Sequence, residues 1–155
     1  MIKRTSLHNW NRQLDRDGSD VWHGAMNLWR TVPAEGFTIE RRNLVLECMS
    51  HISSTMTGWR RAVGGDAAAA VRIAIRMGNP PVLSPKVDLI MTVLLRSAFE
   101  DHAAALVLAH RLNAAPLEDR RIRAHLADSW LSYGVWLASR RRKGPGPKPA
   151  DEVNE

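Results

Sequence analysis

Residues 39–63, IERRNLVLECMSHISSTMTGWRRAV, carry the clearest helical periodicity in the chain. Apolar side chains recur there at alternating spacings of four and three residues, which places them on one side of an α-helix. The members of this seam are Val45, Met49, Ile52, Met56, Trp59 and Val63. Thr38 can cap the helix and Gly64-Gly65 can end it. The pattern predicts a single helix over the whole range.

Two further stretches predict helices of similar length. Ser84-Pro85 combines a capping serine with a proline at the first helical position, and the apolar stripe after it runs to about Leu112. Whether that helix is continuous or bends near Ala98 is left open by the pattern. The last helix is expected from Leu117 to about Arg142, and a short one, capped by Asp66, from Ala67 to Met77.

Strand signals are nearly absent, so the sequence predicts an all-α fold. We expect an antiparallel helical bundle of about five to six helices, three of them long. Residues 1–143 are expected to form a single helical domain in which residues 1–37 are a loosely attached N-terminal helical pair. Residues 144–155, rich in Gly, Pro and charge, are expected to be a flexible tail.

Composition bears on the cellular compartment and on membrane association. The 155 residues include 22 Lys and Arg against 16 Asp and Glu, and a single cysteine, Cys48, so no internal disulfide can form. A lone cysteine fits a reducing compartment, and we expect a cytoplasmic location. The polar N-terminus does not resemble a secretory signal, and charged residues interrupt the most apolar stretch, so no membrane association is expected.

Signatures of catalysis are missing from the sequence, so we expect neither an enzyme nor a bound cofactor. Cys48 lies inside a helical pattern, which favours a structural thiol. A metal- or cofactor-binding bundle built on His and Glu remains the second alternative. Its candidate residues are Glu47, His51, Asp101, His102 and His110.

Basic clusters recur along the chain and support a first alternative, in which a basic helical subunit binds the phosphate backbone of DNA or RNA within a nucleoprotein assembly. That hypothesis requires the clusters to converge on one face of the folded protein. The candidate residues are Arg41, Arg42, Arg60, Arg61, Arg72, Arg76, Arg120, Arg121, Arg123, Arg140, Arg141, Arg142 and Lys143.

Six tryptophans are many for this length. Trp59, Trp130 and Trp136 fall at helical core spacing, whereas Trp10, Trp22 and Trp29 cluster in the weakly patterned N-terminal third. Because tryptophan dominates the energetics of protein interfaces, this second group suggests a Trp-rich contact surface. The leading hypothesis is therefore a non-enzymatic adaptor or regulatory protein whose partner is another protein chain or a second copy of itself.

Overall fold

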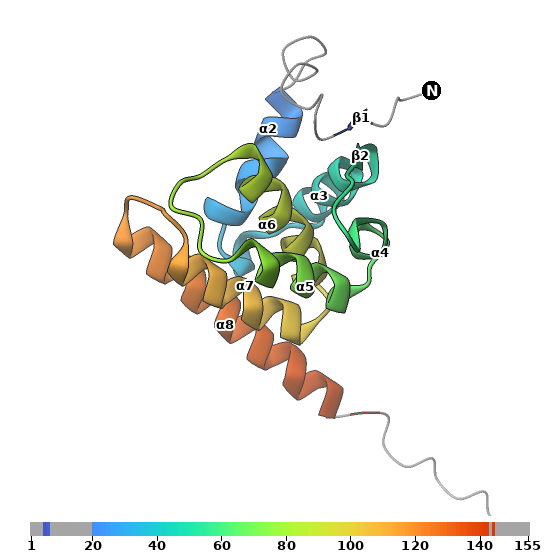
Figure 1. Ribbon diagram of the computed structural model, residues 1–155. Helices are drawn as coiled ribbons and strands as arrows, with labels where there is room; N and C mark the ends of the chain where they lie inside the picture. The colour runs from blue at the N-terminus through green and yellow to red at the C-terminus, as the bar shows by residue number, and fades with distance from the viewer. Residues whose placement is uncertain (1–4, 7–19, 143, 145–155) are drawn as a thin grey trace, which may run out of the picture.

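The computed structural model describes residues 5–6, 20–142 and 144, with side chains from residue 24 onward, and it confirms the all-α fold (Figure 1). Two short 3-10 turns, η1 and η2, follow the first described helix, and a two-residue strand, β1, pairs in parallel with β2. The elements are β1 Thr5–Ser6, α2 Asp20–Asn27, η1 Leu28–Arg30, η2 Ala34–Gly36, α3 Ile39–His51, β2 Ile52–Ser53, α4 Trp59–Val63, α5 Ala67–Met77, α6 Pro85–Ala98, α7 His102–Ala114 and α8 Arg120–Arg142.

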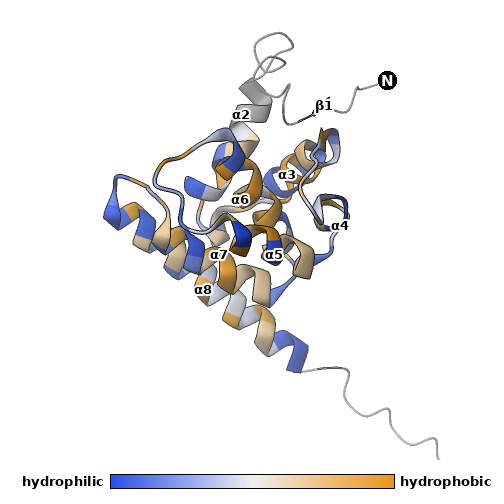
Figure 2. Cartoon of the chain, viewed as in Figure 1, coloured by the Kyte–Doolittle hydropathy of each residue, from blue (hydrophilic) through white to orange (hydrophobic). Residues whose placement is uncertain are grey.

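Helix α6 lies at the centre of the bundle, and α2, α3, α4, α5 and α7 all contact it. Ten of its 14 residues are buried, among them Leu89, Val93 and Leu94. A helix that is apolar around most of its circumference must be enclosed on most sides, because every exposed apolar side chain forfeits its transfer free energy. Figure 2 shows this central helix as strongly hydrophobic.

The single helix predicted over residues 39–63 is wrong. Helix α3 ends at His51, Ile52–Ser53 is extended, and α4 begins only at Trp59. Hydroxyl side chains in the intervening stretch compete for backbone hydrogen bonds, and the Met56 amide donates to Ser54 Oγ at 3.1 Å. Gly58, with φ of +86°, then redirects the chain into α4.

The second long prediction, from Pro85 to about Leu112, also divides into two helices. The helix is interrupted before Asp101. The Asp101 carboxylate accepts a hydrogen bond from the Ala104 amide at 2.9 Å and so caps the start of α7. The chain turns at Phe99–Asp101, which lets α7 pack beside α6. Of the three long helices expected, the structure contains only α8, with 23 residues.

The helix starts predicted from capping residues are confirmed. Thr38, Asp66 and Ser84 each accept a hydrogen bond from the backbone amide three residues later. Helix α5 spans the predicted residues, and α6 begins at Pro85. Local capping chemistry therefore predicted where helices begin better than periodicity predicted where they end.

The N-terminal segment 1–37 was expected to be loosely attached, and its described part is instead built into the core. Ala25, Met26, Trp29 and Phe37 are buried. The Trp29 indole donates from Nε1 to Asp88 Oδ1 of α6 at 2.9 Å, which holds η1 against the central helix. Residues 1–4 and 7–19 of the expected N-terminal helical pair lie outside the described residues, as does the tail expected at 144–155 apart from Gly144.

Helix α8 runs along the outside of the bundle, beside α7 (Figure 1). Gly134 permits this close packing, because a Cβ atom at that position would lie 3.2 Å from the Ala105 Cβ atom and 3.0 Å from Leu106 Cδ2. Among the described helices, none combines the length and the apolar composition that crossing a bilayer requires.

Replacing a buried leucine of α6 should cost far more stability than replacing an exposed one. We expect Leu94→Ala to lower the free energy of unfolding by about 2–5 kcal/mol, because it leaves a cavity in the centre of the bundle. The matched control Leu46→Ala, at a solvent-exposed position of α3, should change it by about 0.5 kcal/mol or less. Urea unfolding followed by circular dichroism measures both; equal losses would contradict the central placement of α6.

Candidate functional site

Of the three tryptophans predicted to form a contact surface, the structure describes the side chain of Trp29. Trp10 lies outside the described residues, and Trp22 belongs to α2 but its side chain is not described. Trp29 is fully buried, and its indole donates a hydrogen bond to Asp88, so it is not part of an exposed surface in this structure. Its indole is an anchor of the core.

Among the tryptophans whose side chains the structure describes, Trp136 is the one that reaches the surface. The sequence pattern placed Trp59, Trp130 and Trp136 in the core; Trp59 and Trp130 are buried, but 47% of Trp136 is exposed. Trp136 follows Trp130 by six positions, which is about 120° around the helix. That angle takes it out of the buried side of α8, and a helical wheel of residues 120–142 would have revealed it.

Aromatic rings in tilted and edge-to-face contact connect Trp136 to the core. Ring centroids lie 5.1 Å apart for Phe37 and Phe99, 6.0 Å for Phe99 and Trp130, 5.5 Å for Trp130 and Tyr133, and 5.4 Å for Tyr133 and Trp136. The Tyr133 hydroxyl donates to the Phe99 carbonyl oxygen at 2.6 Å, at the end of α6. These contacts fix the orientation of the outermost ring.

Two arginines from distant parts of the chain lie against rings of this group. The Arg42 guanidinium of α3 lies 4.9 Å from the Phe99 ring centroid and donates to the Tyr133 hydroxyl at 3.5 Å. The Arg140 guanidinium lies 4.9 Å from the Trp136 ring centroid. Both distances suit cation–π attraction. We call Arg42, Tyr133, Trp136 and Arg140 the ring–arginine cluster.

Neither Arg42 nor Arg140 forms an ion pair with a carboxylate in the described part of the chain. The neighbouring Arg141 does, since its Nη2 atom lies 3.4 Å from Asp101 Oδ2. The cluster therefore presents positive charge beside an exposed indole, and its charges are held in place by aromatic faces.

The other predicted basic residues do not gather at this cluster. Arg123 donates to the Ala115 carbonyl oxygen and Arg76 to that of Thr57, while Arg61 pairs with Asp66. The two ends of α8 are about 33 Å apart at 1.5 Å per residue, which separates Arg120 and Arg121 from Arg141 and Arg142. Arg41 bonds to the Gly36 carbonyl oxygen, Arg60 and Arg72 are exposed on α4 and α5, and Lys143 lies outside the described residues.

The residues considered for a metal site are dispersed. Glu47 and His110 are exposed, Asp101 is the cap of α7, and His51 and His102 are half-buried. Among the described residues, no three of His, Cys, Asp and Glu lie close enough together to hold a metal ion.

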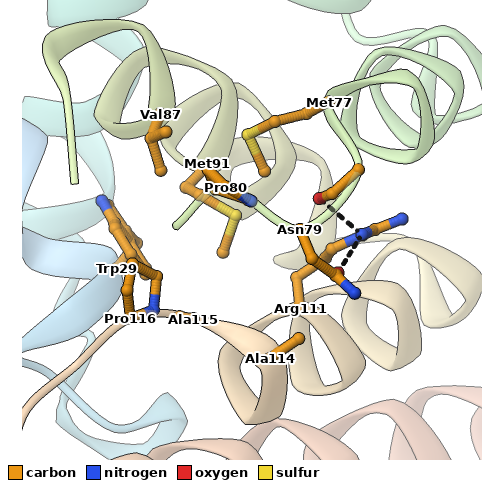
Figure 3. A pocket seen from close by; sticks show the side chains of 11 residues that line it. Trp29, Met77, Asn79, Pro80, Val87, Met91, Arg111, Ala114, Ala115 and Pro116 are labelled. Atoms are coloured by element: carbon orange, nitrogen blue, oxygen red, sulfur yellow. Dashed lines mark hydrogen bonds between the residues drawn. The ribbon is translucent and has the colours of Figure 1, made fainter. Parts of the chain in front are cut away.

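A small cavity between η1, α6 and the end of α7 has a volume of about 10 Å³ (Figure 3). Trp29, Met77, Val87 and Met91 supply apolar walls, and Arg111 closes one side by donating to the Gly78 carbonyl oxygen at 2.9 Å. A space of this size holds at most about one water molecule, so it cannot accept an organic ligand.

Gly64-Gly65-Asp66 does not form an anion site at the start of α5. The Asp66 carboxylate occupies that position by accepting from the Ala69 amide at 3.0 Å. This backbone hydrogen bond, with the bond from Arg61, lowers the pKa of Asp66. A phosphate group would meet a carboxylate there.

No protein-family model matches this sequence, and neither a curated protein nor a solved structure shows significant similarity to it.

Cys48 should be chemically inert while the protein is folded. Burial, with a smaller contribution from Glu47, raises the pKa of its thiol to about 12, so the reactive thiolate is scarce at pH 8. We expect iodoacetamide to label the native chain far more slowly than the chain in urea. The chain has only this one cysteine, so mass spectrometry counts labelling directly, and rapid native labelling would contradict its placement.

The raised pKa of Cys48 also makes the free energy of unfolding depend on pH. Above the ordinary thiol pKa of 9.0 the unfolded chain releases a proton that the folded chain retains, so stability falls as pH rises from about 9 toward 12. Cys48→Ala removes this contribution. Urea titrations at pH 8 and pH 10 should therefore show a smaller loss of stability in the variant than in the wild type, and equal losses would contradict the assignment.

Proposed function

We propose that this chain is a non-enzymatic protein-binding subunit that contacts its partner through the ring–arginine cluster. The observation that carries the proposal is the exposed indole of Trp136, held between the Tyr133 ring and the Arg140 guanidinium. Trp, Tyr and Arg are the residue types most enriched at the energetic centres of protein interfaces. The cytoplasmic location expected from the single cysteine is part of this proposal.

The rigidity of the cluster supports the same proposal. Tyr133 is fixed by its hydrogen bond to the Phe99 carbonyl oxygen, and Arg42 is stacked against Phe99. Side chains that are ordered before binding lose little conformational entropy when a partner arrives. A partner carboxylate could pair with Arg42 or Arg140 while an apolar group covers the indole.

A second candidate, binding of single-stranded nucleic acid, rests on the same four residues. An exposed indole can stack on a base, and the flanking guanidinium groups can neutralise phosphates. Against it stands the dispersal of the other arginines, which leaves no continuous basic path from this cluster to the far end of α8. We therefore rank it second.

Trp136→Ala should weaken partner capture by at least about tenfold, because it removes the centre of the contact. The immobilised wild-type chain and the variant are compared in native lysate by quantitative mass spectrometry. Trp136→Phe, which keeps a stacked ring, should retain part of the capture, and Ile75→Ala, at an exposed position of α5, should retain all of it.

Treatment of the lysate with nuclease separates the two candidates. Capture that depends on Trp136 and survives nuclease supports protein binding. Capture that depends on Trp136 and disappears with nuclease supports nucleic acid. Identical capture by wild type and Trp136→Ala, with equal thermal stability of the two, contradicts the cluster as a binding site.

A further inference from the structure

A second surface lies on the opposite flank of α8, where it meets α7. Leu106 of α7 lies beside Gly134 and is 36% exposed. Leu131 lies one turn before Gly134 and Val135 directly follows it, and these side chains are 48% and 59% exposed. We call Leu106, Leu131 and Val135 the α7–α8 apolar surface.

This surface is separate from the ring–arginine cluster. Val135 and Trp136 are neighbours in sequence, so their side chains point about 100° apart around α8. Leu131 and Val135 are four residues apart and share one side of the helix. Small side chains border them, with Ala103 and Ala138 on either helix.

Arg120 and Arg142 lie at the two ends of the side of α8 that carries Leu131 and Val135, and the exposed carboxylate of Asp128 lies on that side between them. Arg120 precedes Leu131 by 11 residues, and Arg142 follows it by 11, which is about three helical turns in each direction. Both arginines are exposed, and neither forms an ion pair within residues 24–142. Figure 2 shows the hydrophilic ends of α8 on either side of its more apolar middle.

This charge pattern disfavours a second copy of the chain as the occupant. Helix α8 has six arginines and one carboxylate, Asp128. An antiparallel pair centred on Leu131 would place Arg120 of one copy against Arg142 of the other, and a parallel pair would align identical arginines. Like charges directly opposed are destabilising in either arrangement.

We infer that the α7–α8 apolar surface binds an acidic amphipathic helix of another protein. Such a helix would place Leu, Ile or Val against Leu106, Leu131 and Val135, and carboxylates near Arg120 and Arg142, which are about 33 Å apart. The apolar middle favours a protein over nucleic acid, because a phosphate backbone gains nothing from covering leucine and valine. The inference uses different residues from the proposed function and does not depend on it.

The probe is a synthetic peptide of about 22 residues with apolar side chains at i, i+3, i+4 and i+7 in its middle and glutamates at both ends. A peptide of the same composition in scrambled order is the control for simple charge attraction. We expect fluorescence anisotropy to show at least about tenfold tighter binding of the amphipathic peptide, and weaker binding as salt is raised.

Two variants test the two parts of the surface. Val135→Asp should weaken binding of the peptide at least about tenfold, whereas Ile75→Asp, at an exposed position of α5, should leave it unchanged. The double variant Arg120→Glu, Arg142→Glu should lose the acidic peptide and gain binding to a peptide with lysines at its ends. Circular dichroism confirms that each variant remains helical, and the charge exchange yields a gain that misfolding cannot produce.

Several results would overturn the inference. Equal binding of ordered and scrambled peptides, or no binding at about 100 μM, would show that the surface does not recognise an acidic helix. Sedimentation of the chain as a dimer that Val135→Asp dissociates would assign the surface to a second copy. Binding of an oligo-dT strand that the same variants abolish would assign it to nucleic acid.

Discussion

Helix α6 must be enclosed, and the remaining helices are arranged to enclose it. Ten of its 14 residues are buried, and its half-buried carboxylate, Asp88, accepts hydrogen bonds from Trp29 and Arg30 of η1. Five helices contact α6, so the core is assembled around one element of the chain. This arrangement explains why the described part of the N-terminal segment is buried.

The position of α8 follows from the same constraint. Since α6 is already covered by its neighbours, α8 packs mainly on α7, and Gly134 and Ala105 bring those two helices together. Only one side of α8 is then needed for packing. Its two flanks expose Trp136 on one side and Leu131 with Val135 on the other, beside cations at both ends. Most of the residues proposed to bind partners therefore lie on the sides of α8 that packing leaves exposed.

Sequence patterns predicted the fold class and the capped helix starts at Thr38, Asp66 and Ser84, because those signals are local. The break at Ile52 was missed and the break at Asp101 was left open, since apolar periodicity continues through both while local side-chain hydrogen bonds decide the backbone. The pairing of Arg42 with Tyr133 joins residues 91 positions apart, and no local pattern carries it. The burial of Trp29 could not be read from the sequence either, because its hydrogen bond to Asp88 is likewise a tertiary contact.

Native-state hydrogen exchange tests the central role of α6 most directly. If the bundle is built around this helix, amides of residues 89–98 exchange only when the whole chain unfolds, so their exchange free energy equals the global free energy of unfolding. Amides at the two ends of α8, which no other helix encloses, exchange through smaller local openings. If the amides of α6 exchanged at a lower free energy than those of α8, the central role of α6 would be contradicted.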